Sequence, residues 1–93
     1  MARRTTQRRG FFIEARSGEP DGQWLRIVVP KSVHKRAVRR NMLRRQVREW
    51  VRRRLGPGGA PARLTIRISK EALSLSRQSR YDLLAEQFAK IGF

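Results

Sequence analysis

The 93-residue sequence contains no cysteine, which excludes disulfides and thiolate chemistry and argues against a zinc finger. Long apolar runs are also missing, and no segment approaches the length that a membrane-spanning helix needs. The N-terminal "MARRTTQRRG" has no apolar core after its basic residues, so we do not expect a secretory signal. These absences favour a cytoplasmic protein, and the length allows one small domain.

Side chains suited to catalysis are few. The one histidine, His34, stands beside Lys35 and Arg36 with no acid nearby to orient its ring. The seven acidic residues form no close pair and no metal-ligand spacing, and "GPGG" lacks the Lys-Ser/Thr of a phosphate-binding loop. We therefore interpret His34 as a polar residue at a helix start. We expect no catalytic residue, metal or cofactor on the protein alone.

Acidic residues are scarce in comparison with basic ones. The sequence has 23 Lys and Arg against 7 Asp and Glu, a formal net charge of +16, and most of the cations are arginine. Arginine makes planar, bidentate contacts to phosphate. A charge this far from zero destabilises a compact state unless a polyanion offsets it. Nucleic acid is therefore the first candidate partner, and an anionic membrane is the second.

Three segments alternate between apolar and polar residues, as half-buried strands do. They span residues 10–16, 24–29 and 63–69, and Pro30 ends the second because it cannot donate to a strand ladder. The turn-forming residues 17–23 predict a hairpin loop, and 56–61 predict a break. The residues expected to face the core are Phe11, Ile13, Ala15, Leu25, Ile27, Val29, Leu64, Ile66 and Ile68.

Two segments have the pattern of amphipathic helices. The first runs from about residue 33 to 55 with Ser32 as its expected N-cap, and the second spans 80–93. Leu43, Val47, Trp50 and Val51 form the apolar stripe of the first helix. The order strand, strand, helix, strand, helix predicts an α+β two-layer sandwich with a small mixed sheet and two main helices. We expect a flexible basic arm over residues 1–9 and a single RNA-binding domain over 10–93.

The arginines of the first helix are arranged in an unusual way. Positions 36, 40, 44, 48 and 52 are all arginine, with no acid between them in that series. Like charges four residues apart destabilise an isolated helix, so a bound polyanion is a better explanation than a solvated face. A basic amphipathic helix can also lie on a membrane, but three half-buried strands need this apolar stripe to cover them.

The polar faces of the predicted strands favour RNA. Phe12 and Trp24 are expected to share these faces with Arg26 and Arg67, and aromatic rings among cations form a stacking platform for unpaired bases. Packing under the second helix or the N-terminal arm explains the two aromatics equally well. A helix-turn-helix that reads DNA needs a helix pair, whereas strands flank this helix.

The segment "KSVHKRAVRRNMLRRQVRE", residues 31–49, resembles the signature helix of the bacterial ribonuclease P protein family. The matching positions are Lys31, Arg36, Ala37, Arg40, Asn41, Arg45, Arg48 and Glu49, with Arg44 in place of a lysine. Met42 stands where the family usually has a second arginine. The order of "WLRIVVP", a Pro/Gly loop and "ARLTIRIS" is also similar. The family begins with a helix carrying an Arg-x-x-x-x-Phe pattern, which we expect to be missing here or reduced to the arm.

The resemblance implies a ribosomal protein S5 domain 2-like fold with a left-handed βαβ crossover. It also implies a monomeric subunit of ribonuclease P that binds the catalytic RNA and precursor tRNA one-to-one, while that RNA and its Mg²⁺ remove the 5′ leader. The expected RNA-binding residues are Lys31, Lys35, Arg36, Arg39, Arg40, Asn41, Arg44, Arg45, Arg48 and Arg52. The expected leader-binding residues are Phe12, Trp24, Arg26 and Arg67.

Two other functions fit the composition. A ribosomal-type structural RNA-binding protein would have a similar size and charge, and a membrane-active basic protein is a third possibility. The Arg-Ala-x-x-Arg-Asn helix between strands favours the ribonuclease P subunit over the ribosomal type. We expect neither DNA nor a membrane as the partner.

Overall fold

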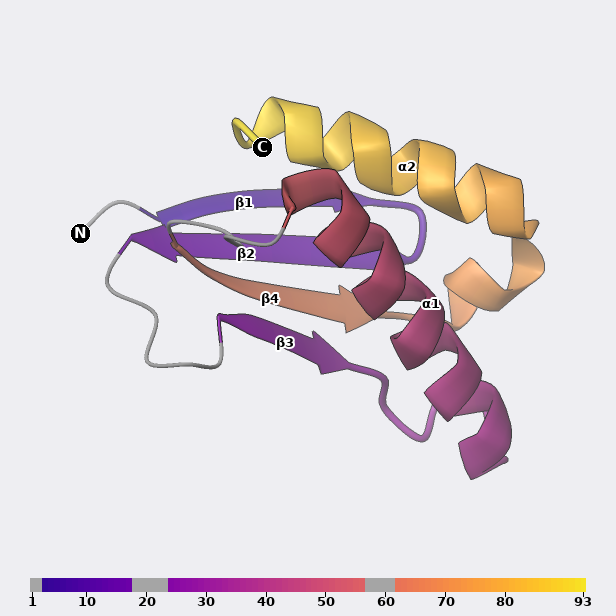
Figure 1. The fold of residues 1–93 in the computed structure, drawn as a ribbon. Helices are drawn as coiled ribbons and strands as arrows, with labels where there is room; N and C mark the ends of the chain where they lie inside the picture. The colour runs from indigo at the N-terminus through magenta and orange to yellow at the C-terminus, as the bar shows by residue number, and fades with distance from the viewer. Residues whose placement is uncertain (1–2, 18–23, 57–61) are drawn as a thin grey trace.

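The protein is described by a computed structural model, which covers residues 3–17, 24–56 and 62–93 as a mixed sheet with helices on one face (Figure 1). The two main helices and four strands give the expected α+β architecture. In chain order the elements are β1 (Arg3–Arg8), β2 (Phe11–Ser17), β3 (Leu25–Val28), α1 (Ala37–Leu55), β4 (Ala62–Ile68), the 3₁₀ helix η1 (Lys70–Ser74) and α2 (Arg77–Lys90).

The sheet has the order β1-β2-β4-β3, so β1 and β3 are its edge strands. β2 pairs antiparallel with both β1 and β4, whereas β3 pairs parallel with β4. Parallel neighbours need a long crossover, and α1 supplies it. With α1 toward the viewer, β3 and β4 run left to right and β4 lies above β3 (Figure 1). The crossover is therefore left-handed, as the resemblance implies and against the usual preference.

The core lies between the sheet and the helices. Inward-facing residues of β2 and β4 are fully buried, and α1 covers them with Leu43, Val47 and Val51. α2 adds Leu84 and Phe88. The alternation predicted for the three strands is thus confirmed by their burial. The buried strand and strand-end residues are Phe11, Ile13, Ala15, Ile27, Val29, Leu64, Ile66 and Ile68.

The expectation of a flexible arm over residues 1–9 is wrong for residues 3–8, which form β1. This strand has no apolar alternation because it is an edge strand whose side chains are mostly exposed. A complete backbone register with β2 orders it, from Arg3 opposite Arg16 to Arg8 opposite Phe11. The connection to β2 is tight, and Gly10 adopts a φ of 99° there, a value that glycine tolerates without strain.

The start of α1 also differs from the expectation. The helix begins at Ala37 rather than Val33, and its N-cap is Arg36, which makes no side-chain capping bond. Ser32 instead lies in a turn that buries Val33, whose N–H donates to the Pro30 carbonyl at 3.0 Å. Burial of Val33 holds the connecting chain against the core, so the helix starts one turn later.

The second helix, expected over 80–93, spans Arg77–Lys90, so it both starts and ends three residues earlier than expected. Ser76 caps it by accepting from the Ser79 N–H at 3.1 Å. One turn into the helix, Arg80 is a buried cation. Its guanidinium donates to the Leu75 carbonyl at 2.8 Å and to Gln46 Oε1 of α1 at 3.2 Å, and burial lowers its pKa from the ordinary value.

Candidate nucleic-acid interface

The outer surface of α1 is strongly cationic. Eight of its 19 residues are arginine, its one acid is Glu49, and none lies in the first turn. The buried stripe faces the sheet, so the charge is left on the solvent side. Three arginines in the last turn sit where the helix dipole favours cations, while those nearer the N-terminus have no such compensation.

The structure places the predicted RNA-binding residues on this surface and on the connection that precedes it. Most are exposed, while Arg40 and Arg44 are half-buried. The exposed members are Lys31, Lys35, Arg36, Arg39, Asn41, Arg45, Arg48 and Arg52. Together they form one continuous basic region from the end of β3 to the last turns of α1.

Arg40 has a structural partner that the helical wheel did not reveal. Its guanidinium folds back to donate to the carbonyls of His34 and Lys35, at 2.7 and 3.1 Å. His34 in turn accepts from the Arg36 N–H through Nδ1 at 3.0 Å, as expected for a polar residue at a helix start. Arg40 therefore braces the loop that leads into α1.

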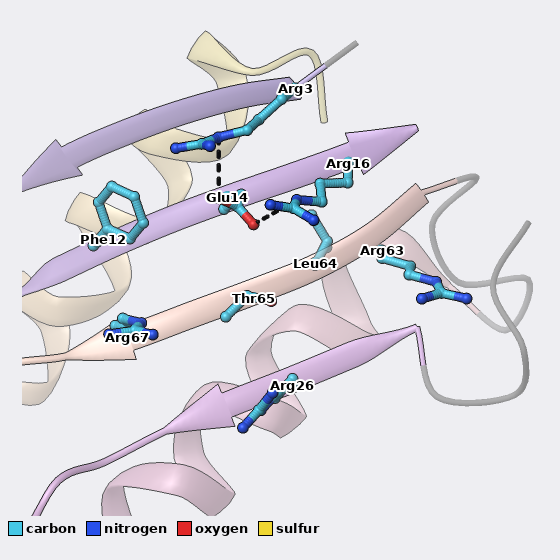
Figure 2. Close-up of a pocket in the computed structure, with 9 residues that line it drawn as sticks. All are labelled: Arg3, Phe12, Glu14, Arg16, Arg26, Arg63, Leu64, Thr65 and Arg67. Atoms are coloured by element: carbon cyan, nitrogen blue, oxygen red, sulfur yellow. Dashed lines mark ion pairs between the residues drawn. The ribbon is translucent and has the colours of Figure 1, made fainter. Parts of the chain in front are cut away.

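The open face of the sheet, opposite the helices, carries a shallow depression (Figure 2), which we call the sheet-face depression. The strand registers align its side chains in rows across the sheet. Phe12 lies beside Arg67 in one row, and Arg16 lies beside Arg63 in another. The residues that line the depression are Arg3, Phe12, Glu14, Arg16, Arg26, Arg63, Leu64, Thr65 and Arg67.

Among the described residues that line the sheet-face depression, Glu14 is the one acid. Its carboxylate forms ion pairs of 3.1 Å with Arg3 of β1 and with Arg16 of its own strand (Figure 2). Both arginine side chains are about 60% exposed, at 58% and 60%, so they keep donors free for solvent or a ligand. Sequence reasoning missed Arg3 because β1 was not expected, and the tight turn at Gly10 was the available signal.

Trp24 does not lie on the same face as Phe12, and that expectation is wrong. Trp24 precedes the first paired residue of β3 and packs partly against the core, so strand alternation does not fix its direction. It lines a second depression between edge strand β3 and helix α1, which we call the β3–α1 groove. The residues that line the groove are Trp24, Leu25, Arg26, Ile27, Arg44, Arg48 and Arg52.

The side of the molecule that α2 occupies carries acids that offset part of its positive charge. Glu86 of α2 pairs with Arg8 at 2.6 Å and with Lys90 at 3.8 Å, and Glu71 pairs with Arg9 at 3.5 Å. These pairs are exposed and contribute little to stability, but they lower the net charge around α2. The uncompensated positive charge is therefore concentrated on α1, the connection before it and the open sheet face.

No group of three or more His, Asp or Glu residues could hold a metal ion in the ranges 3–17, 24–56 and 62–93. No helix in that part of the chain is long and apolar enough to cross a membrane.

A cationic crossover helix on a small mixed sheet, with an open arginine-rich face, defines a class of compact basic α+β proteins. Residues 1–92 match the sequence model of the ribonuclease P protein family, and the chain belongs to that family. No curated protein sequence matches it significantly.

Solved structures show the same fold. The Staphylococcus aureus RNase P protein superposes with a TM-score of 0.82 at 19% identity, covering 97% of this chain and 82% of that one. The Thermotoga maritima RNase P protein gives a TM-score of 0.64 at 27% identity, over 91% and 81% of the two chains. Family and fold together support a subunit of ribonuclease P.

Proposed function

We propose that this protein is the RNA-binding subunit of a cytoplasmic ribonuclease P, acting on precursor tRNA to promote removal of the 5′ leader. The observation that carries the proposal is the basic surface of α1 in a chain that belongs to this family. The catalytic RNA and precursor tRNA are both polyanions that repel each other. A protein that binds both lowers this repulsion at their junction.

The physical mechanism is the replacement of counterions. Cations on the α1 surface displace condensed ions from RNA phosphates, and their release into bulk solution favours binding. Asn41 holds Arg44 in place, because its Oδ1 accepts from the guanidinium at 2.9 Å. Bidentate arginine donors then fix the orientation of the RNA backbone. In this proposal Arg39 and Arg45 contact phosphates of the catalytic RNA.

The hydrolysis itself is assigned to the RNA and its Mg²⁺. The side chains of this protein bind and position the two RNAs, and they also reduce the Mg²⁺ concentration that the reaction needs, because arginine replaces part of the counterion charge. One protein molecule per catalytic RNA is expected.

Of the two hollows, the sheet-face depression is the better candidate for binding the precursor leader. Phe12 is half-buried with its ring in the depression, beside Arg67, and Arg26 lines the same depression from β3, on the far side of β4 (Figure 2). An unpaired base can stack on Phe12 while the two arginines contact the adjoining phosphates. Replacing Phe12 by Ala should weaken binding of precursor tRNA with a leader and leave binding of mature tRNA unchanged.

The deciding experiment is cleavage of precursor tRNA by a bacterial ribonuclease P RNA at low Mg²⁺, with and without this protein. Restored cleavage at the correct 5′ position supports the proposal. Affinity for the RNA should also fall steeply with salt, by roughly 10³-fold or more between 50 and 200 mM if about six phosphates are contacted.

Two results would contradict the proposal. RNA binding without any effect on cleavage would indicate a structural RNA-binding protein of the ribosomal type. Binding to anionic vesicles in preference to RNA would indicate a membrane-active protein.

A further inference from the structure

The β3–α1 groove combines features that the sheet face does not. Arg44, Arg48 and Arg52 line one wall, each one helical turn from the next. Side chains at this spacing lie about 5–6 Å apart on a helix, which is comparable to the separation of successive phosphates in a nucleic acid strand. Among the described residues that line the groove there is no acid. This wall is therefore a row of cations matched to one strand rather than a diffuse basic patch.

The opposite wall of the groove is the edge strand β3. Among the strands that the structure describes, β3 pairs with β4 alone, so one row of its backbone N–H and C=O groups has no strand partner there. Trp24 stands at the start of this wall, half-buried and beside the arginines. An aromatic ring next to phosphate-binding cations is the combination that proteins use to hold unpaired nucleotides.

Arg26 connects the groove to the sheet-face depression. It lies on β3 and lines both hollows, so the two are adjacent across a single edge strand. Phe12 on one side and Trp24 on the other provide one aromatic ring for each. The two hollows thus form a basic path around β3, with an aromatic residue in each half.

We infer that a single-stranded RNA segment lies in the β3–α1 groove, with successive phosphates on Arg44, Arg48 and Arg52 and a base stacked on Trp24. The same strand continues past Arg26 onto the sheet face. The inference rests on the proposed function in taking RNA as the ligand, and it adds a second single-strand site and its path. An acidic peptide added to the β3 edge is the competing occupant. Three arginines one turn apart fit a regular row of phosphates better.

The chain offers a direct reporter, because its two tryptophans are Trp24 and Trp50. Trp50 packs edge-on against Phe88 with ring centroids 5.0 Å apart, so a W50F variant keeps an aromatic ring there and leaves Trp24 as the single fluorophore. Titration of this variant with oligouridylate should quench its emission to saturation. The matched W24F variant, which reports Trp50, should show no comparable change.

Arginine variants in the W50F background test the phosphate row. R48Q should weaken the oligouridylate interaction and reduce the slope of log affinity against log salt by about 0.7, the contribution of one single-strand phosphate contact. R53Q is the matched control, because Arg53 is exposed on the same helix and does not line the groove. Equal effects of R48Q and R53Q would overturn the inference, since they would show that only total charge matters.

Length and competitor tests address the path and the identity of the occupant. Affinity should rise as oligouridylate is lengthened past the groove, and F12A should remove that gain while short oligomers still quench Trp24. Quenching by duplex RNA, or by poly-glutamate, at the same concentrations as oligouridylate would overturn the inference. Precursor-tRNA cleavage with the same preparations separates the two proposals: stimulated cleavage without Trp24 quenching rejects the groove site alone, whereas loss of both rejects the proposed function.

Discussion

Glu14 is the residue whose replacement best tests whether RNA lies on the open sheet face. It places a negative charge in an otherwise basic depression and engages Arg3 and Arg16, at 3.1 Å each. An E14Q variant removes that charge and releases both guanidinium groups. If RNA phosphates lie on this face, the variant should bind RNA more tightly than the native protein.

The expected magnitude follows from the charges and their exposure. A unit charge about 7 Å from a phosphate contributes roughly 0.6 kcal/mol in water, which low salt preserves and physiological salt reduces. Each released arginine that reaches a phosphate adds about 0.7 to the salt slope of a single strand. We expect affinity to rise roughly 3- to 10-fold at 50 mM salt, with a steeper salt dependence.

The cost to stability should be small. Both ion pairs join Glu14, whose side chain is 18% exposed, to arginines that are mostly exposed, and such pairs contribute roughly 0.2–1 kcal/mol each. Urea denaturation of E14Q should therefore show a loss of about 1 kcal/mol in the free energy of unfolding. A much larger loss would mean that the pairs organise the β1–β2 ladder, and the affinity could then not be interpreted.

A matched control is available in Glu86. Like Glu14 it joins two basic side chains, Arg8 and Lys90, but it lies on α2 on the other side of the sheet. E86Q makes the same change in net charge and should alter RNA affinity less than twofold. Equal gains for E14Q and E86Q, or no gain for E14Q, would refute the placement of RNA on the sheet face.

Three further predictions concern the framework that holds the interface. G10A should destabilise the protein by about 2–4 kcal/mol in urea denaturation, because a Cβ at this positive φ would lie 2.7 Å from the Ala72 backbone nitrogen. R80M should lower the free energy of unfolding by about 2–4 kcal/mol, because the Ala72 and Leu75 carbonyls and Gln46 Oε1 would lose their donor. An unchanged urea midpoint would show that Arg80 is dispensable. Q87M should change the free energy of unfolding by less than about 1 kcal/mol. The bond that Gln87 Nε2 donates to the Phe11 carbonyl stabilises the fold, but the buried Oε1 has no partner among the described residues, and its desolvation offsets that gain.

Much of the molecule could be predicted locally. Alternation identified β2, β3 and β4 with their inward faces, and helical periodicity identified α1 with its buried Leu43, Val47 and Val51. β1 was missed because an exposed edge strand has no apolar pattern, and its order comes from the ladder with β2. Loop predictions at 18–23 and 57–61 fall outside the described residues.

The chemistry of the surface follows from the amino-acid sequence alone. We can recognise three features without knowing the fold: the excess of arginine, the lack of cysteine and the arginine repeat every four residues. Charge and helical period are local properties of the sequence. The signature around Arg36 and Asn41 pointed to the family for the same reason.

The grouping of these residues in space depends on the folded arrangement of the strands and helices. In the sequence, Phe12 and Trp24 are both aromatic residues in basic strand segments. In the fold, Phe12 lines the sheet-face depression, whereas Trp24 lines the β3–α1 groove. Arg40 belongs to the basic repeat but braces a loop, and Arg3 joins the interface from a segment without any strand pattern. The physical reason is that strand order and the crossover of α1 are set by long-range burial. Side chains far apart in sequence meet only once that burial has fixed the sheet.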